Sequence, residues 1–116
     1  MIEPAEFALT ARAEYDGRTV VALAGELDLY RAQALTDALQ AAEGPVVVDL
    51  QEVTFLDSTT LALFVSEYRR RRAAGLDLTV LVGPRTPKTV FAITGIDRIL
   101  AVRSAEAPPA TEAMAA

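Results

Sequence analysis

The sequence predicts an α/β fold in which a mixed sheet of four or five strands is surrounded by helices. The prediction rests on two observations. The spacing of apolar residues switches between period 2 and helical spacing several times, as expected when strands alternate with helices. An Asp16-Gly17 pair also separates two β-like runs, which is the signature of a hairpin. Right-handed crossovers then place the helices over the sheet, with the hairpin at or near an edge.

The first elements are a hairpin and a helix. Residues 7–13 alternate between apolar residues and smaller or more polar neighbours, and residues 19–24 form an apolar, β-branched run. Beyond Asp28 the spacing becomes helical, and Gly44-Pro45 ends that helix. Its apolar positions are Leu35, Leu39 and Ala42. The pattern therefore predicts two antiparallel strands followed by a helix that begins near Leu29.

A short buried strand and a second helix follow. Residues 46–48 are a continuous valine run, typical of a strand buried on both faces of a parallel sheet. This strand leads into a loop that carries Asp57. The pattern is helical from Ser58 to about Ala74, and Gly75 suits the position after a helix end. The apolar face of this helix comprises Leu61, Phe64, Val65 and Tyr68.

The last elements complete the alternation of strands and helices. Residues 76–82 predict a strand, and Thr86-Pro87 supplies the N-cap and first residue of a third helix that closes at Gly95. A short strand over residues 99–102 completes the sheet. We therefore expect a single domain over residues 5–103, followed by a flexible C-terminal tail over residues 104–116.

The composition excludes several classes of function. The chain has 116 residues, 52% of them apolar, and its lack of His and Cys removes the imidazole base, the thiolate nucleophile and any disulfide. A net charge of −5 disfavours nucleic acid as a partner. No apolar run is long enough to cross a bilayer, and the acidic N-terminal stretch is unlike a secretory leader. We therefore expect a cytoplasmic protein with no catalytic residue, cofactor, metal ion or membrane insertion.

Three polar segments follow predicted strands, where open α/β sheets place their sites. They cover residues 26–28, 57–60 and 83–85. Ser58 stands out because it begins a helix, where unpaired backbone N–H groups and the macrodipole stabilise an added anion. Its hydroxyl is therefore a candidate for phosphorylation, although Asp57 and Ser58 also suit an ordinary N-terminal cap.

Two sets of charged residues have alternative interpretations. Asp28 either caps the helix that begins near Leu29 or joins Asp57 in binding magnesium. The arginine run over residues 69–72 lies in the last turn of the second helix, where cations complement the helix dipole; the alternative is contact with a partner. Local pattern alone favours the capping and dipole interpretations.

Three motifs, taken in order, resemble the STAS-domain anti-sigma factor antagonists of bacteria. They are Gly25-Glu26-Leu27-Asp28, Val47-Val48-Asp49-Leu50 and Phe55-Leu56-Asp57-Ser58-Thr59. Gly83-Pro84 and the stretch over residues 90–96 are also similar to that family. The resemblance covers residues 7–102, nearly the whole chain. Each motif alone is weak, whereas their order and spacing are specific.

The resemblance implies a partner-switching function regulated by phosphorylation. Unphosphorylated members of that family bind an anti-sigma factor that is also a serine kinase, and so free a sigma factor. By the resemblance, the kinase phosphorylates Ser58, with Thr59 and Thr60 as alternative acceptors, and a serine phosphatase reverses the mark. The implied partner surface comprises Asp28, Asp57, Ser58, Thr59, Thr60 and Leu61. The chain itself is expected to be a monomer or a weak dimer.

One position departs from the family pattern. The motif usually has glycine where this chain has Thr60, which brings a β-branched side chain and another hydroxyl close to Ser58. Phosphorylation could then be slowed, redirected or lost, so a second function stays open: an accessory subunit that binds a transporter ATPase without phosphorylation. A third interpretation, a small enzyme or nucleotide-binding protein using Asp28, Asp57 and Ser58, is disfavoured by the missing His, Cys and phosphate-binding glycine loop.

Overall fold

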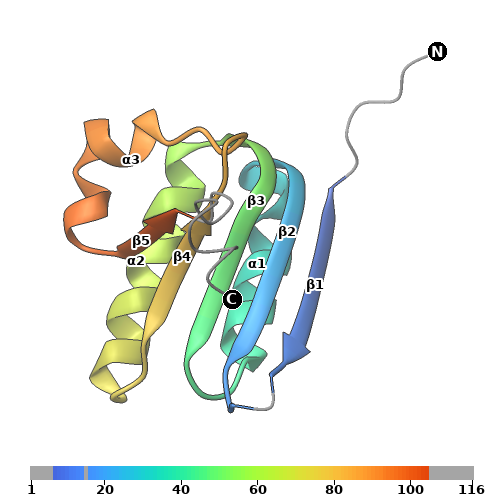
Figure 1. Cartoon of the computed structure of the whole chain (residues 1–116), viewed down its shortest axis with the longest axis vertical. Coiled ribbons are helices and arrows are strands. Elements are labelled where there is room, and N and C mark those ends of the chain that lie inside the picture. The colour runs from blue at the N-terminus through green and yellow to red at the C-terminus, as the bar shows by residue number, and fades with distance from the viewer. Residues whose placement is uncertain (1–6, 15, 105–116) are drawn as a thin grey trace, which may run out of the picture.

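The computed structural model describes residues 7–14 and 16–104, in which five strands form one mixed sheet (Figure 1). The strands are β1 (Ala8–Ala13), β2 (Thr19–Leu27), β3 (Val46–Leu56), β4 (Leu78–Val82) and β5 (Ala101–Ser104). Their order in the sheet is their order in the chain. β1 pairs antiparallel with β2 at one edge, and every later pair is parallel. The predicted α/β fold and edge hairpin are therefore confirmed.

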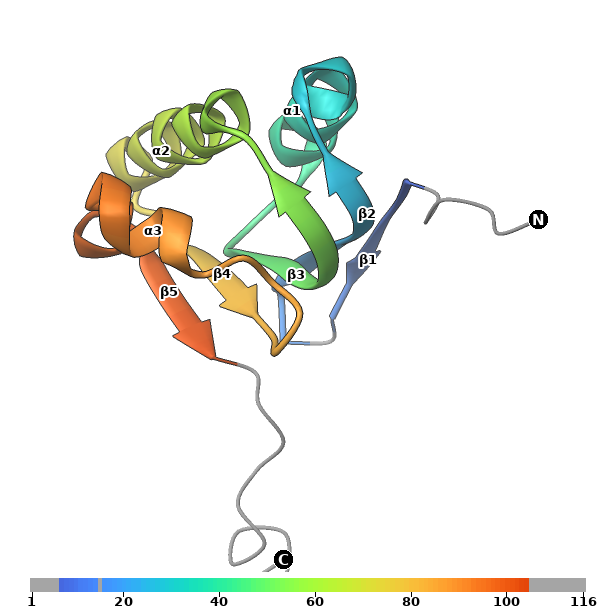
Figure 2. The ribbon, with the colours of Figure 1, turned by 90° about the horizontal axis from the view of Figure 1, so that it is seen from above.

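Helices connect the parallel strands. They are the 3-10 helix η1 (Leu29–Arg31), α1 (Ala32–Ala41), α2 (Ser58–Ala73), α3 (Thr89–Thr94) and the 3-10 helix η2 (Ile96–Arg98). Because each parallel strand lies beside the preceding one, right-handed crossovers bring successive helices to the same face. Accordingly, α1 and α2 lie side by side over one face of the sheet (Figure 2). Within the described ranges, no helix is long and apolar enough to span a membrane.

The hydrophobic core fills the space between the sheet and the helices. Leu35 and Leu39 of α1 and Phe64 of α2 are fully buried there. Val46 and Val48 of β3 are also buried, whereas Val47 between them is only partly buried on the opposite face. The prediction that residues 46–48 are buried on both faces is wrong, because α1 and α2 cover the same face of the sheet.

β3 is longer than the sequence pattern indicates. It runs for 11 residues, and its register with β2 shifts twice, each time with one extra residue in β3. As a result, the core-facing side chains Leu50, Val53 and Leu56 recur at every third position instead of every second. These bulges hide the period-2 alternation. The expectation of a short strand followed by a loop is wrong for this reason.

The start of α3 also differs from the prediction. α3 begins at Thr89, not at Thr86-Pro87. The buried hydroxyl of Thr86 donates to the carbonyl oxygen of Leu50 over 2.6 Å and accepts the N–H of Gly83 over 3.0 Å. Thr86 therefore ties the turn after β4 to β3 and does not cap α3.

The remaining boundaries shift by a few residues. β2 extends to Leu27 rather than residue 24, and β4 begins at Leu78 rather than residue 76. Ser104 is the last residue of β5 and not the first of the tail. Residues 5–6 of the predicted domain and residues 105–116 of the predicted tail lie outside the described residues.

The end of α2 agrees with the sequence prediction. Gly75 follows the helix with a φ of 75°, a conformation that side chains with a Cβ rarely adopt. The N–H groups of Gly75 and Leu76 donate to the carbonyl oxygens of Arg72 and Arg71, each over 2.9 Å. This pair of bonds is a Schellman motif, which satisfies carbonyl groups that the end of a helix leaves free.

Arg71 caps the neighbouring helix α1. Its side chain is buried, and its guanidinium donates to the carbonyl oxygens of Leu39 over 3.1 Å, of Ala42 over 3.3 Å and of Gly44. Burial lowers the pKa of Arg71, and the charge of Arg70 acts in the same direction. A guanidinium nevertheless stays protonated at neutral pH. One member of the arginine run thus joins the C-terminal ends of α1 and α2.

We expect Arg71→Ala to lower the free energy of unfolding by about 3 kcal/mol, because three carbonyl oxygens lose their donor in a largely water-excluded site. Urea unfolding followed by circular dichroism measures the change. Arg69→Ala, which removes an exposed arginine from the same run, is the matched control and should change stability by less than about 0.5 kcal/mol. Equal losses in the two variants would contradict the capping role.

Candidate functional site

Two of the three predicted polar segments meet at one edge of the sheet. Leu27 at the end of β2 pairs with Leu56 at the end of β3, so Asp28 and Asp57 leave the sheet side by side. Asp28 begins the connection to α1, and Asp57 begins α2. This edge lies at the top of Figure 1.

The third segment, residues 83–85, lies elsewhere. β4 ends well before β3 does. Leu81, the last residue but one of β4, is opposite Asp49, whereas β3 continues to Leu56. The segment is therefore beside the middle of β3. A Cβ built on Gly83 would lie 3.2 Å from Gln51, and Arg85 forms an exposed ion pair of 3.8 Å with Glu52. The structure thus separates this segment from Asp57 and Ser58.

The Asp57 carboxylate connects two segments of the chain. As the N-cap of α2, its Oδ1 accepts the N–H of Thr60 over 2.9 Å and lies 2.8 Å from the Thr60 hydroxyl. Its Oδ2 accepts the N–H of Leu29 over 3.0 Å. The predicted capping role of Asp57 is confirmed, and the structure adds a bond to the turn after β2.

Thr60 is fully buried at this junction. Its hydroxyl lies 2.8 Å from Asp57 Oδ1 and 3.1 Å from the carbonyl oxygen of Leu27. A hydroxyl has one proton, so these two acceptors share it or take it in turn. Thr60 therefore contacts the end of β2 and the cap of α2 at once.

Ser58 and Thr59 are exposed in the first turn of α2. Their side chains stand where the helix dipole is positive and where first-turn N–H groups lack partners within the helix. A negative group added to the Ser58 hydroxyl would meet this favourable field and, at the same time, the neighbouring Asp57 carboxylate. A phosphate at this position would therefore change the charge of the site strongly.

Asp28 has a separate local role. Its Oδ1 accepts the N–H of Tyr30 over 3.1 Å, which caps η1, and its Oδ2 pairs with Arg31 at 3.2 Å. Asp28 and Asp57 thus already accept hydrogen bonds from protein donors. In residues 7–14 and 16–104, no group of three or more acidic side chains is placed to hold a metal ion. The geometry supports capping over the magnesium interpretation.

Burial divides the expected partner-binding residues into two groups. Ser58 and Thr59 are exposed, and Asp28 and Asp57 are partly exposed. Thr60 and Leu61 have no exposed surface, because they face the core beneath the start of α2. The expectation that Thr60 and Leu61 contact a partner directly does not fit the structure. Helical phase puts residue 61 one turn after Asp57, on the side that packs against the sheet.

Three exposed apolar residues that the sequence pattern did not reveal lie on the segments that meet at Asp57. Leu29 is 61% and Tyr30 is 89% exposed, both on η1, whose Leu29 N–H bonds to Asp57. Phe55, near the end of β3, is 45% exposed. Two adjacent apolar residues directly after an N-cap aspartate look like the start of a buried helix face. Only the position of η1 outside the core reveals their exposure.

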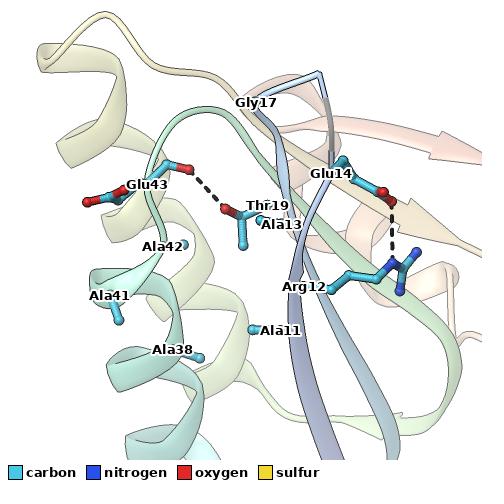
Figure 3. A pocket seen from close by; sticks show the side chains of 10 residues that line it. All are labelled: Ala11, Arg12, Ala13, Glu14, Gly17, Thr19, Ala38, Ala41, Ala42 and Glu43. Carbon is cyan, nitrogen blue, oxygen red and sulfur yellow. Dashed lines mark hydrogen bonds and ion pairs between the residues drawn. The ribbon is translucent and has the colours of Figure 1, made fainter.

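A groove of about 480 Å³ lies at the other end of β2, near Thr19. Figure 3 shows it between β1 and the C-terminal end of α1, and five of its ten lining residues are alanine. Glu43 contributes a carbonyl oxygen that accepts the Thr19 hydroxyl over 2.9 Å. The polar side chains Arg12 and Glu14 bond to each other at 3.3 Å. The groove presents no arrangement typical of catalysis.

Comparison with known proteins identifies the family. The family model described as "Mlab, STAS domain" matches residues 10–102, so the chain belongs to the STAS domain family. Among its relatives, the anti-sigma-B factor antagonist of Listeria monocytogenes is 34% identical over 88 residues, which cover 72% of this chain and 77% of the relative. The protein of the same name from Listeria innocua matches equally.

Solved structures show the same fold. An anti-sigma factor antagonist from Mycobacterium paratuberculosis superposes with a TM-score of 0.69 at 24% identity, over 95% of this chain and 92% of the other. The Bacillus cell fate determinant SpoIIAA in its phosphorylated form gives a TM-score of 0.64 at 20% identity, over 93% and 97%. The α/β architecture predicted from the sequence is therefore that of the STAS domain.

We expect Asp57→Ala to lower the free energy of unfolding by about 1–2 kcal/mol, because it removes the N-cap of α2 and the acceptor of the Leu29 N–H. Asp28→Ala is the matched control, since it removes the cap of the three-residue η1 and a partly exposed ion pair with Arg31, and should cost less than about 1 kcal/mol. Thermal unfolding compares the two variants. A loss for Asp28→Ala as large as for Asp57→Ala would show that Asp57 does not connect the segments as described.

Proposed function

We propose that this chain is an anti-sigma factor antagonist: it binds an anti-sigma factor through the surface around Ser58, so that a sigma factor is released. The single observation that carries the proposal is the exposed Ser58 hydroxyl at the start of α2, beside the exposed pair Leu29 and Tyr30. Family membership and the Listeria relatives support it. The anti-sigma factor is proposed to be a serine kinase that phosphorylates Ser58, and a serine phosphatase removes the phosphate.

Phosphorylation of Ser58 turns the interaction off through charge. A phosphate adds about −1.5 to −2 charges next to Asp57. A partner that fits Leu29 and Tyr30 closely would have to bury that charge or meet it with a like charge, and both are unfavourable. Because α2 is already capped by Asp57, the modification needs no refolding of the domain. Its effect is confined to the surface that the partner contacts.

Accessibility supports Ser58 over the other candidate acceptors. The Thr60 hydroxyl is buried and hydrogen-bonded, so a kinase cannot reach it without opening the start of α2. Thr59 is exposed but follows Ser58 by one residue, so its side chain points in a different direction around the helix. The proposed partner surface therefore comprises Asp28, Asp57, Ser58 and Thr59, together with Leu29 and Tyr30.

The proposal extends to the mode of action, the location and the oligomeric state of the chain. The chain acts by binding and not by catalysis, without cofactor or nucleic acid, in the cytoplasm, as a monomer or weak dimer. A second function, an accessory subunit that binds a transporter ATPase without phosphorylation, keeps the same surface and changes the partner. Thr60, in place of the family glycine, is the observation that keeps this second function in consideration.

The first test is phosphorylation by each anti-sigma factor kinase encoded in the same genome, with ATP and the purified chain. We expect one added phosphate, mapped to Ser58 by mass spectrometry, absent from Ser58→Ala and retained in the matched control Thr59→Ala. Phosphate on Thr59 would contradict the proposal that Ser58 is the phosphorylated residue. Tight binding with no phosphate would leave an antagonist that is not switched by phosphorylation, or an accessory subunit. Neither phosphate nor binding would support the accessory-subunit function.

The exposed apolar pair is tested by binding. We expect Tyr30→Ala to weaken binding of the anti-sigma factor by at least about tenfold, because exposed aromatic side chains are frequent anchors of interfaces. Isothermal titration calorimetry measures the affinity. Arg72→Ala is the control, because Arg72 is exposed in the last turn of α2, at the opposite end of that helix from Ser58, and it should change affinity less than about threefold. If Arg72→Ala weakens binding more than Tyr30→Ala does, the partner surface lies elsewhere.

A further inference from the structure

We infer that Thr60 is a positioning residue: its buried hydroxyl orients the Asp57 carboxylate, and the carboxylate in turn holds the Leu29–Tyr30 turn against the start of the Ser58 helix. The consequence for partner binding rests on the proposed function. The structural part does not, because it concerns contacts within this chain.

The hydrogen bonds form a chain of connections. The Thr60 hydroxyl lies between the Leu27 carbonyl oxygen, at 3.1 Å, and Asp57 Oδ1, at 2.8 Å. The other carboxylate oxygen, Oδ2, accepts the Leu29 N–H over 3.0 Å. One buried side chain therefore links the last residue of β2 to the residue that begins η1, by way of Asp57.

The Thr60 hydroxyl restricts rotation of the Asp57 carboxylate, which the backbone N–H of Thr60 does not do alone. An N-cap bond from the Thr60 N–H, at 2.9 Å, satisfies Oδ1 but leaves the carboxylate able to turn about its bond to Cβ. The Thr60 hydroxyl is a second donor to the same oxygen, and it shares its one proton with the carbonyl oxygen of Leu27 at the end of β2. This additional bond restricts the rotation. The restriction matters because only one orientation of the carboxylate directs Oδ2 at the Leu29 N–H.

The turn held in this way has little packing of its own. Leu29 and Tyr30 are mostly exposed, and η1 contains no buried residue. The N–H groups of Leu29 and Tyr30 donate to the carboxylates of Asp57 and Asp28, and these hydrogen bonds therefore determine where Tyr30 lies relative to Ser58. A surface ordered before binding loses less conformational entropy when a partner docks. Thr60 thus adjusts affinity without touching the partner.

The structural arm of the test is amide hydrogen exchange of the intact chain, followed by NMR. In Thr60→Val, which keeps the shape of the side chain and removes the hydroxyl, we expect the Leu29 amide to exchange about tenfold faster. Thr60→Ser, which restores the hydroxyl, should stay within about threefold of the wild type at the same amide.

Thr86→Val is the matched control. Thr86 is also buried, and its hydroxyl also joins a strand to a turn, because it contacts Leu50 inside β3 and Gly83 after β4. We expect this variant to lose global stability to a degree similar to Thr60→Val. The exchange rate of the Leu29 amide, divided by the exchange rates of the core amides of β3, should stay within about twofold of the wild-type ratio. General destabilisation is thereby separated from the specific effect of Thr60.

The binding arm uses the anti-sigma factor that phosphorylates the wild-type chain. Thr60→Val should weaken binding about tenfold, Thr60→Ser should restore it, and phosphate should still map to Ser58. Unchanged Leu29 exchange in Thr60→Val, or equal acceleration in Thr60→Ser, would overturn the inference. If no anti-sigma factor binds the wild-type chain, the proposed function fails, while the exchange data still decide the role of Thr60.

Discussion

The Asp57 carboxylate is the interaction on which the candidate site depends. Pairing of β2 with β3 brings Asp28 and Asp57 to one edge of the sheet, but the segments that leave those strands run to different helices. Asp57 joins them because its two oxygens face different parts of the chain: Oδ1 bonds to Thr60 and Oδ2 to Leu29. Without these hydrogen bonds, the exposed turn and Ser58 would follow paired strands, but Asp57 would not join the two segments.

The two large helices are connected at both ends. At their N-terminal ends, the turn before α1 bonds to Asp57, the cap of α2. At their C-terminal ends, Arg71 of α2 bonds to the last carbonyl groups of α1 and the turn that follows it. Fully buried Leu35, Leu39 and Phe64 pack between these polar connections. A charge placed on Ser58 would therefore act on a surface whose helices are already held in place by these contacts. Such a surface suits a switch that works by electrostatics.

Sequence reasoning succeeded where the determinants are close together in the chain. Asp57 as an N-cap and Gly75 as a helix terminator depend on bonds within a few residues, and both predictions are confirmed. It failed where the partner is distant. Thr86 is of a residue type favoured at the N-cap, but its hydroxyl donates to the carbonyl oxygen of Leu50, which is 36 residues away in the chain. The length of β3 was missed because two bulges, visible only in its pairing with β2, break the alternation.

By itself, the sequence determined the order of strands and helices, the edge hairpin and the serine at a capped helix start, because each follows from local periodicity and turn chemistry. Only the tertiary structure decided which side chains of that region face solvent. Thr60 and Leu61 are buried and Leu29 and Tyr30 exposed, although all four lie near the same helix starts. The physical reason is that burial depends on which elements cover a residue, and those elements are set by contacts between segments far apart in the chain.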